Sequence, residues 1–323
     1  EAAYAAAHPG RPSRAAAVSK PRVANGVWTA WFQSGTEDAL RWTMVYVDPY
    51  SGEVTGQRVW GTDLMGTIYR LHYTLLGGDA GATVVGVAGV VLMASVASGV
   101  WLWWPLWRSG WRAAFAIRRG RRFNYDFHKT TGIAAAPVLL IVAFTGVYMT
   151  FPEWITPVVA AFSDVTPPIE GLTSAPAAAG RSLTPEEAVA IALEQFPEAS
   201  FDHFHPPQTP DGAYEVGLRQ PGEVQRSFGA TQVWIDRHTG SVLAVRNPDQ
   251  LTAGDTFLAW QFPLHNGEAF GLPGRLLVFA SGFAPAVLYV TGLVLWWRKR
   301  RPRGKRESTV PGSRQFAHVN RAT

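Results

Sequence analysis

Three long stretches without a charged residue or a histidine place the strongest constraint on how this chain folds. They cover residues 81–107, 130–152 and 276–297. Each exceeds the roughly 20 residues that a helix needs to cross about 30 Å of hydrocarbon. A buried helix of a soluble protein is the alternative for any one stretch, but three of them, all flanked by aromatic and charged residues, favour a membrane protein. We therefore expect three spanning helices.

Basic residues gather beside the ends of these stretches. Residues 108–126 hold six arginines and the tail from residue 298 holds nine basic residues, against only Asp126 and Glu307 as acids. Since Lys and Arg favour the cytoplasmic side, we expect both segments in the cytoplasm and the remaining polar parts outside the cell membrane. The arginines form no separate basic domain, so we expect no nucleic-acid partner despite the pI of about 9.6.

A repeat without gaps relates the first and third stretches at an offset of 193 residues. Leu71-His72 corresponds to Leu264-His265, and the glycines and tryptophan pairs that follow are kept as well: Gly81, Gly89, Gly99 and Trp103-Trp104; Gly274, Gly282, Gly292 and Trp296-Trp297. For a single histidine, a hydrogen bond in the protein core is the simpler account. Two equivalent imidazoles at one membrane face favour a shared ligand, and haem iron accepts two axial histidines. The repeat predicts that His72 and His265 hold one haem.

The chain has no cysteine, which excludes disulfides, iron–sulfur clusters and covalently attached haem. His128 lies at the opposite membrane face, at the start of the second stretch. An interfacial anchor is the alternative there. The symmetry that pairs His72 with His265 predicts a partner for His128 as well, and two stacked haems would carry electrons across the bilayer.

A second repeat lies in the polar parts, at an offset of 188 residues. Asp48 and Asp236 each begin an Asp-x-x-Ser/Thr-Gly turn between two predicted strands. At that offset the alanine-rich opening of the chain matches the end of a helix that begins after Thr184 in the second copy. We therefore expect an upstream portion with a fourth spanning helix that carries the partner of His128.

Other features suggest weaker assignments. His203 and His205 share one face of a predicted strand, but no third metal ligand is evident and a solvated strand face is the simpler account. Residues 266–268 would border a site for an electron acceptor. Pro285 should kink the last helix, and we expect no broken helix at mid-membrane, which weakens a transport function. No dinucleotide or nucleotide-binding loop is recognisable, so the electrons must come from another molecule.

Together the paired turns at Asp48 and Asp236, the Leu-His elements at His72 and His265, the Phe-His start at His128 and the Trp-Trp ends resemble the PepSY-associated transmembrane family. That family includes iron-regulated membrane proteins and ferrisiderophore reductases. The resemblance implies a four-helix inner-membrane protein with two small α/β PepSY modules in the periplasm. In the characterised reductases it also implies b-type haems that pass electrons to a ferric siderophore.

The sequence predicts a membrane α-helical bundle with two periplasmic PepSY modules, containing two haems b when the fourth helix is counted. Its function would be ferric-chelate reduction for iron uptake, with quinol or a cytoplasmic reductase as donor. The alternative is a non-enzymatic sensor or scaffold that binds or inhibits an exported protease or another partner. The expected segments are a truncated first module (1–60), a Leu-His element with a spanning helix (61–107), an arginine-rich loop (108–126), a spanning helix (127–152), the second module (163–248), the second Leu-His element with its helix (257–297) and a basic tail (298–323).

Overall fold

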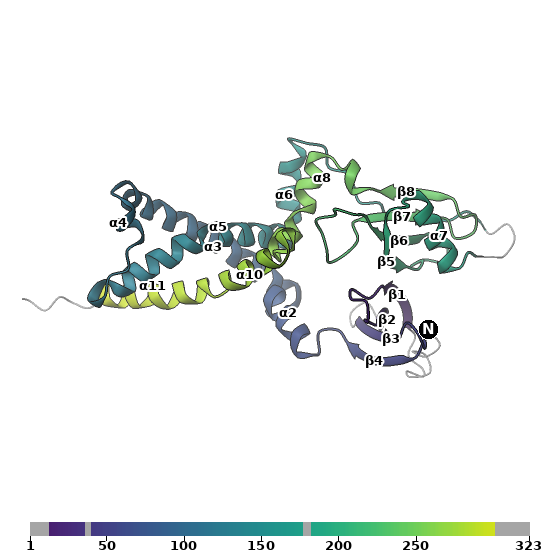
Figure 1. The fold of residues 1–323 in the computed structure, drawn as a ribbon, viewed down its shortest axis with the longest axis horizontal. Helices are drawn as coiled ribbons and strands as arrows, with labels where there is room; N and C mark the ends of the chain where they lie inside the picture. The colour runs from purple at the N-terminus through teal and green to yellow at the C-terminus, as the bar shows by residue number, and fades with distance from the viewer. Residues whose placement is uncertain (1–12, 36–39, 177–181, 301–323) are drawn as a thin grey trace, which may run out of the picture.

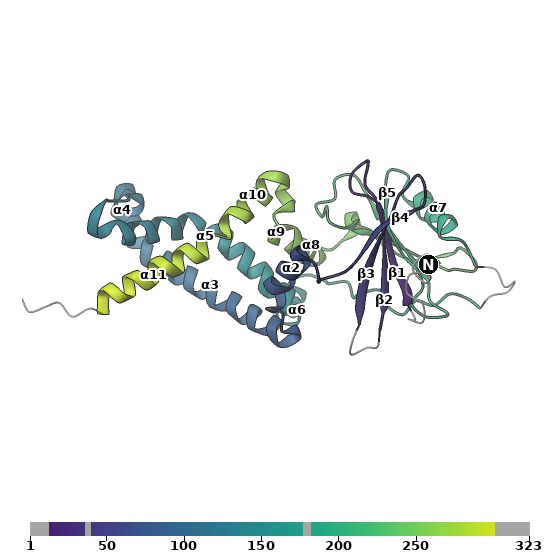
Figure 2. The same ribbon diagram turned by 90° about the horizontal axis from the view of Figure 1, so that it is seen from below.

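The computed structural model describes residues 13–35, 40–176 and 182–300. The molecule is elongated, with a helical bundle at one end and a β-sheet at the other (Figure 1). Short helices lie between these two parts, as both views show (Figure 2). The expected start in mid-helix concerns residues 1–7, which lie outside the described residues.

Three segments of the described chain are long and apolar enough to cross a membrane: Gly78–Arg108, Gly120–Thr150 and Glu268–Arg300. They contain the helices α3 (Gly78–Arg108), α5 (Phe123–Thr150), α10 (Gly271–Ser281) and α11 (Ala284–Arg300). Helix α5 packs against both α3 and α11. Many large apolar side chains of the bundle are exposed, among them Val87, Val91, Leu102, Phe279 and Val290. Such a surface suits lipid rather than water, so the three spans agree with the sequence prediction.

The arginine-rich loop and the basic residues 298–300 that end α11 lie at the end of the bundle far from the sheet (Figure 1). Helices α4 (Trp111–Phe115) and η2 (Gly120–Arg122) connect α3 to α5 there, and α11 ends at the same place (Figure 1). The two basic segments therefore face the same side of the membrane, as the charge pattern requires.

The third span differs from the prediction, because it is interrupted rather than kinked. Helix α10 ends at Ser281 and α11 begins at Ala284, with Gly282 and Phe283 between them. Pro285 is the second residue of α11, where its missing N–H costs no helical hydrogen bond. The expectation of no broken helix within the membrane was thus wrong.

Between bundle and sheet lie α2 (Leu64–Thr74), α6 (Pro152–Ala160), α8 (Ala253–Ala259), α9 (Gln261–His265) and η4 (Glu268–Phe270). The repeated glycines explain how these short helices meet the spans. A Cβ at Gly81 would lie 1.7 Å from the carbonyl oxygen of Thr74, and a Cβ at Gly274 would lie 2.2 Å from that of Gly267. Both contacts join residues seven positions apart, so the repeat preserves one way of turning from a surface helix into a span.

Eight antiparallel strands form one sheet, in the order β4-β3-β2-β1-β5-β6-β7-β8. The first unit contains β1 (Ser13–Ser19), β2 (Trp28–Ser34), β3 (Arg41–Val47) and β4 (Val54–Val59), and the second contains β5 (Ser200–His205), β6 (Tyr214–Arg219), β7 (Thr231–Ile235) and β8 (Val242–Arg246). The units meet where β1 pairs with β5. The sequence predicts two modules but not their union in one sheet.

The two Asp-x-x-Ser/Thr-Gly turns have the same geometry. Asp48 Oδ1 accepts hydrogen bonds from the backbone N–H groups of residues 50 and 51, and Asp236 Oδ1 accepts them from residues 238 and 239. Gly52 and Gly240 close the turns with φ of 71° and 77°, values that favour glycine. The duplicated hairpin is confirmed.

Helix α7 (Pro185–Gln195) covers the second unit, and η3 (Pro248–Gln250) follows β8. Thr184 and Glu187 form the capping box at the start of α7. Between α7 and the sheet lies a core of fully or nearly fully buried side chains: Ala188, Ala192, Phe204, Tyr214, Val216, Leu218, Val233 and Ile235. Burial alone would raise the pKa of Asp236, but the N–H groups of Ala175, Thr239 and His238 outweigh it and hold the pKa at about 2.

Candidate functional site

His72 and His265, which the repeat pairs in the sequence, face each other in the structure. His72 belongs to α2 and His265 ends α9, and their ring centres are 5.9 Å apart with 45° between the ring planes. An imidazole nitrogen binds a first-row metal at about 2 Å, so two imidazoles on opposite sides of one iron have centres roughly 6 Å apart. The two side chains therefore have a separation that suits one shared metal centre.

Hydrogen bonds to α5 fix the ring of His265. Its Nδ1 lies 3.0 Å from the carbonyl oxygen of Val142 and 2.9 Å from Oγ1 of Thr145. The hydroxyl of Thr145 donates to the carbonyls of residues 141 and 142 in its own helix, so Nδ1 of His265 must carry the proton and donate. The Nε2 lone pair of His265 is then available to a ligand.

Burial lowers the pKa of His265 below its ordinary value, and the positive charge of His72 lowers it further. His265 is half-buried, whereas the side chain of His72 is exposed. A neutral imidazole is the form that ligates a metal, so this environment favours the form that a ligand needs.

His128 lies in the first turns of α5, at the other end of the bundle. Its Nδ1 is 2.7 Å from Oγ1 of Thr291 on α11. Thr291 in turn donates to the carbonyl of Val287, so its hydroxyl accepts the proton of His128. The Nε2 atom of His128 is therefore also left with a free lone pair. No second histidine ring is in contact with it among the described residues.

Both histidines are held by a Thr-Gly dipeptide of a neighbouring helix, and we call Thr145-Gly146 and Thr291-Gly292 the threonine–glycine pairs. A Cβ at Gly146 would lie 3.2 Å from Cε1 of His265, and a Cβ at Gly292 would lie 3.4 Å from Cε1 of His128. The threonine orients the ring and the glycine leaves space for it. The sequence interpretation named Gly292 as part of the repeat but did not connect either dipeptide with a histidine, although its recurrence inside uncharged stretches was a signal.

The internal repeat extends this pattern to α3. At the offset of 193 residues, Thr291-Gly292 corresponds to Ser98-Gly99. A Cβ at Gly99 would meet nothing within 4 Å in the part of the chain that the structure describes. Helix α3 thus contains the equivalent dipeptide Ser98-Gly99, but no histidine of the described segments packs on it.

Charged groups anchor the start of α5 and with it His128. Asp126 is fully buried, and its two carboxylate oxygens accept hydrogen bonds of 2.8 Å from the guanidinium of Arg118. The ammonium of Lys129 lies 3.6 Å from the same carboxylate. Asn124 adds a hydrogen bond of 2.8 Å to the carbonyl of Thr291, which ties α5 to α11 beside the histidine.

The profile of the family described as PepSY-associated TM region matches residues 1–299. The chain belongs to the PepSY-associated transmembrane family. The match covers both the bundle and the sheet, and with them all three histidines discussed above. No curated protein matches the chain.

The loop of residues 266–268, which the sequence analysis places beside an acceptor site, holds its carboxylate inside this PepSY-associated protein. Residues 266–268 do not offer Glu268 to an acceptor, because its side chain is fully buried. Its Oε2 accepts a hydrogen bond of 2.6 Å from Ser227 in the loop between β6 and β7 and lies 3.5 Å from Arg275 of α10. Glu268 therefore links the sheet to the third span.

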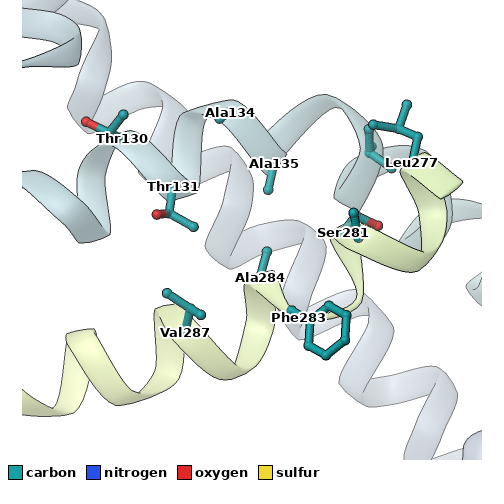
Figure 3. A pocket seen from close by; sticks show the side chains of 11 residues that line it. Thr130, Thr131, Ala134, Ala135, Leu277, Ser281, Phe283, Ala284 and Val287 are labelled. Atoms are coloured by element: carbon teal, nitrogen blue, oxygen red, sulfur yellow. The ribbon is translucent and has the colours of Figure 1, made fainter.

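A groove of about 430 Å³ follows the interruption of the third span, between α5 and the helices α10 and α11 (Figure 3). Its walls are apolar apart from Thr130, Thr131 and Ser281, and no histidine lines it. The groove is thus separate from the histidine sites of this PepSY-associated protein.

The second pair of histidines also differs from the prediction. His203 is only 7% exposed, so β5 does not present it to solvent. Glu215 of β6 lies opposite His205 in the strand register and joins the two histidines in one cluster. The sequence interpretation missed Glu215 because strand pairing, not sequence spacing, brings it there.

Proposed function

We propose that this protein is a haem-containing inner-membrane reductase that moves electrons across the membrane to a ferric chelate in the periplasm. The chelate class is a ferric siderophore, and the outcome is iron release for uptake. Siderophore oxygens bind Fe(II) far less well than Fe(III), so a one-electron transfer weakens their hold on the metal.

The single observation that carries this proposal is the facing pair of His72 and His265. Their ring centres are 5.9 Å apart, and the hydrogen bonds of His265 leave its Nε2 open. With no cysteine in the chain, a b-type haem held by two histidines is the redox group that suits this donor set. Bound there, the haem would supply a one-electron carrier, while the protein orients the imidazoles.

His128 supports the same function at the other end of α5. Eighteen residues of helix separate His128 from Gly146, a rise of about 27 Å. This length is close to the roughly 30 Å of a hydrocarbon core. A second haem held by His128 would extend the electron path to the cytoplasmic face.

The direction of transfer follows from the charges. The arginine-rich end of the bundle is assigned to the cytoplasm, where a reductase or membrane quinol supplies electrons, and the sheet to the periplasm. The sheet units then correspond to the two PepSY modules, on the same side as His72 and His265.

The test is haem content and turnover of the protein purified from membranes. We expect a reduced spectrum of the b type, with haem at the His72–His265 pair and at His128, and, in liposomes that contain quinol, formation of Fe(II) from an external ferric siderophore, followed with an Fe(II) chelator. A purified protein without haem absorbance would overturn the proposal and leave the sensor or scaffold function. A protein that contains haem but forms no Fe(II) would contradict the proposal that a ferric chelate accepts the electrons.

A further inference from the structure

We propose that His203, His205 and Glu215 form a binding site for a divalent first-row transition metal ion, separate from the membrane histidines. The site lies in the sheet, on β5 and β6. It does not depend on the proposed reductase function.

Strand register brings the three side chains to one face of the sheet. His205 pairs directly with Glu215, and His203 pairs with Gly217. The ring of His203 lies over Gly217, where a Cβ would come within 2.1 Å of it. A register shift between Phe201 and His203 marks a bulge, a feature that redirects side chains. One donor atom from each of His203, His205 and Glu215 lies within 4.8 Å of the other two.

Each of the three side chains is already oriented by a hydrogen bond that leaves a donor atom free. His203 Nδ1 lies 3.0 Å from a carboxylate oxygen of Asp202, and His205 Nδ1 lies 3.0 Å from the carbonyl oxygen of Ala16. Because both acceptors require a proton on Nδ1, the Nε2 lone pairs are free. Metal-binding histidines in proteins are commonly held by such carboxylate and carbonyl partners.

Glu215 is prepared in the same way. Its Oε1 accepts a hydrogen bond of 2.8 Å from the side-chain amide of Gln232 on β7. The second carboxylate oxygen of Glu215 is then available to a cation.

The donor set selects the class of metal. Two imidazoles and one carboxylate suit Zn²⁺ or Fe²⁺ better than Ca²⁺ or Mg²⁺, which prefer oxygen ligands. A tetrahedral ion with bonds of about 2 Å would bring the donors roughly 3.3 Å apart. The three side chains therefore need to close by about 1.5 Å at most, which rotamer adjustments supply.

The position of the site gives it a structural consequence. The hydrogen bond from His205 to Ala16 crosses the junction between the two sheet units, where β1 and β5 pair at Val18 with Phe204 and at Ser19 with His203. A bound metal fixes the ring of His205 and so strengthens this junction.

The test uses the full chain purified in detergent, titrated calorimetrically with Zn²⁺ and spectroscopically with Co²⁺, with the Co²⁺ bands taken from difference spectra. We expect one equivalent of Zn²⁺ to bind at the sheet, with visible Co²⁺ bands of a four- or five-coordinate site. Glu215→Gln keeps the size and hydrogen bonding of the side chain and should weaken binding of this equivalent by at least the roughly 10–100-fold that loss of an outer-shell partner costs, and His205→Ala should remove it.

The matched control is His238→Ala, since His238 lies on the same unit but outside the cluster. This variant should bind Zn²⁺ as the wild type does. If wild type, His205→Ala and Glu215→Gln all bind the same number of equivalents with the same affinity, the proposal is wrong. Loss of binding in Glu215→Gln with an unchanged thermal transition of the metal-free protein would support a metal site over a folding defect.

Discussion

His265 and His128 lie at opposite ends of α5, yet each ring is held by a threonine–glycine pair on another helix. His265 packs on Thr145-Gly146 of α5, and His128 packs on Thr291-Gly292 of α11. In both, the threonine hydroxyl donates to its own helix and accepts the Nδ1 proton, so both histidines present Nε2. Helix α5 thus holds the histidine of α9 at one end, while its own histidine is held by α11 at the other end.

The difference between the two ends is the second imidazole. At the sheet end His72 faces His265, with ring centres 5.9 Å apart. At the arginine-rich end, the described residues bring no histidine to His128. Both ends therefore orient a histidine by the same kind of hydrogen bond. Among the described residues, two facing imidazoles are present at the sheet end and one imidazole at the arginine-rich end.

Removing a histidine should have the largest effect and should separate the two ends. We expect His265→Ala and His72→Ala each to lose the haem at the sheet end, about half of the total, since both rings hold the same iron. His128→Ala should lose the other half. Haem content by pyridine haemochromogen, with reduced spectra of the remaining haem, measures this.

His238→Ala is the control, because its ring is remote from the bundle, and it should keep both haems. The assignment of the sheet-end site fails if His265→Ala retains full haem content. It also fails if His72→Ala and His265→Ala remove spectrally different haems.

Threonine variants should lower haem affinity less than loss of a histidine, and by different amounts at the sheet end and at the arginine-rich end. Thr291→Val removes the 2.7 Å hydrogen bond to His128, and Thr145→Val removes the 2.9 Å bond to His265. His265 keeps the carbonyl of Val142 at 3.0 Å. Loss of such an orienting partner costs about 10–100-fold in metal affinity. We therefore expect haem affinity to fall by about 100-fold in Thr291→Val and by about 10-fold in Thr145→Val, because His265 retains its second acceptor.

Haem transfer to a scavenging protein measures these affinities. Thr150→Val is the matched control, because Thr150 on α5 bonds only to the carbonyl of Gly146 in the described contacts. A greater loss from Thr145→Val than from Thr291→Val would contradict the difference between the ends.

Much of this architecture could be predicted because it depends on local composition. Uncharged length identified the spans, and the Asp-x-x-Ser/Thr-Gly turns identified the hairpins. The equivalence of His72 and His265 followed from the register of the repeat. Pro285 indicated that the third span is irregular. A proline is compatible with either a kink or a new helix start, and tertiary packing decides between them.

What could not be predicted depends on contacts between distant segments. His203 is buried because its ring lies over Gly217 of β6, and the strand next to it is β1 from the distant first unit. Glu215 joins the histidines through the register of β6, which no spacing in the sequence reveals. Glu268 is buried because Ser227 and Arg275 converge on it.

The pKa of His265 gives a further test of the sheet end. Burial, followed by the charge of His72, lowers it below the ordinary value of about 6.5. The unfolded chain therefore binds a proton at a higher pH than the folded one, and the folded state loses stability as pH falls below about 6.5. We expect the melting temperature of the haem-free protein to decrease from pH 7 to pH 5, and His265→Gln to reduce that decrease.

Glutamine keeps an amide that can donate to Val142 but has no titrating ring. Equal losses of stability in wild type and His265→Gln over this pH range would show that the lowered pKa of His265 has no part in the effect.

The smallest effects should come from glycine variants, which test how tightly each ring is held. Replacing glycine by alanine within a helix gains up to about 1 kcal/mol where space allows. Gly99→Ala, with nothing within 4 Å, should gain most, and Gly292→Ala, with His128 at 3.4 Å, somewhat less. Gly146→Ala should gain least, because His265 at 3.2 Å must move by a few tenths of an ångström and lengthen its bonds to α5. Melting temperatures of the haem-loaded variants establish the order, and a larger increase for Gly146→Ala than for Gly99→Ala would mean that His265 is free to shift.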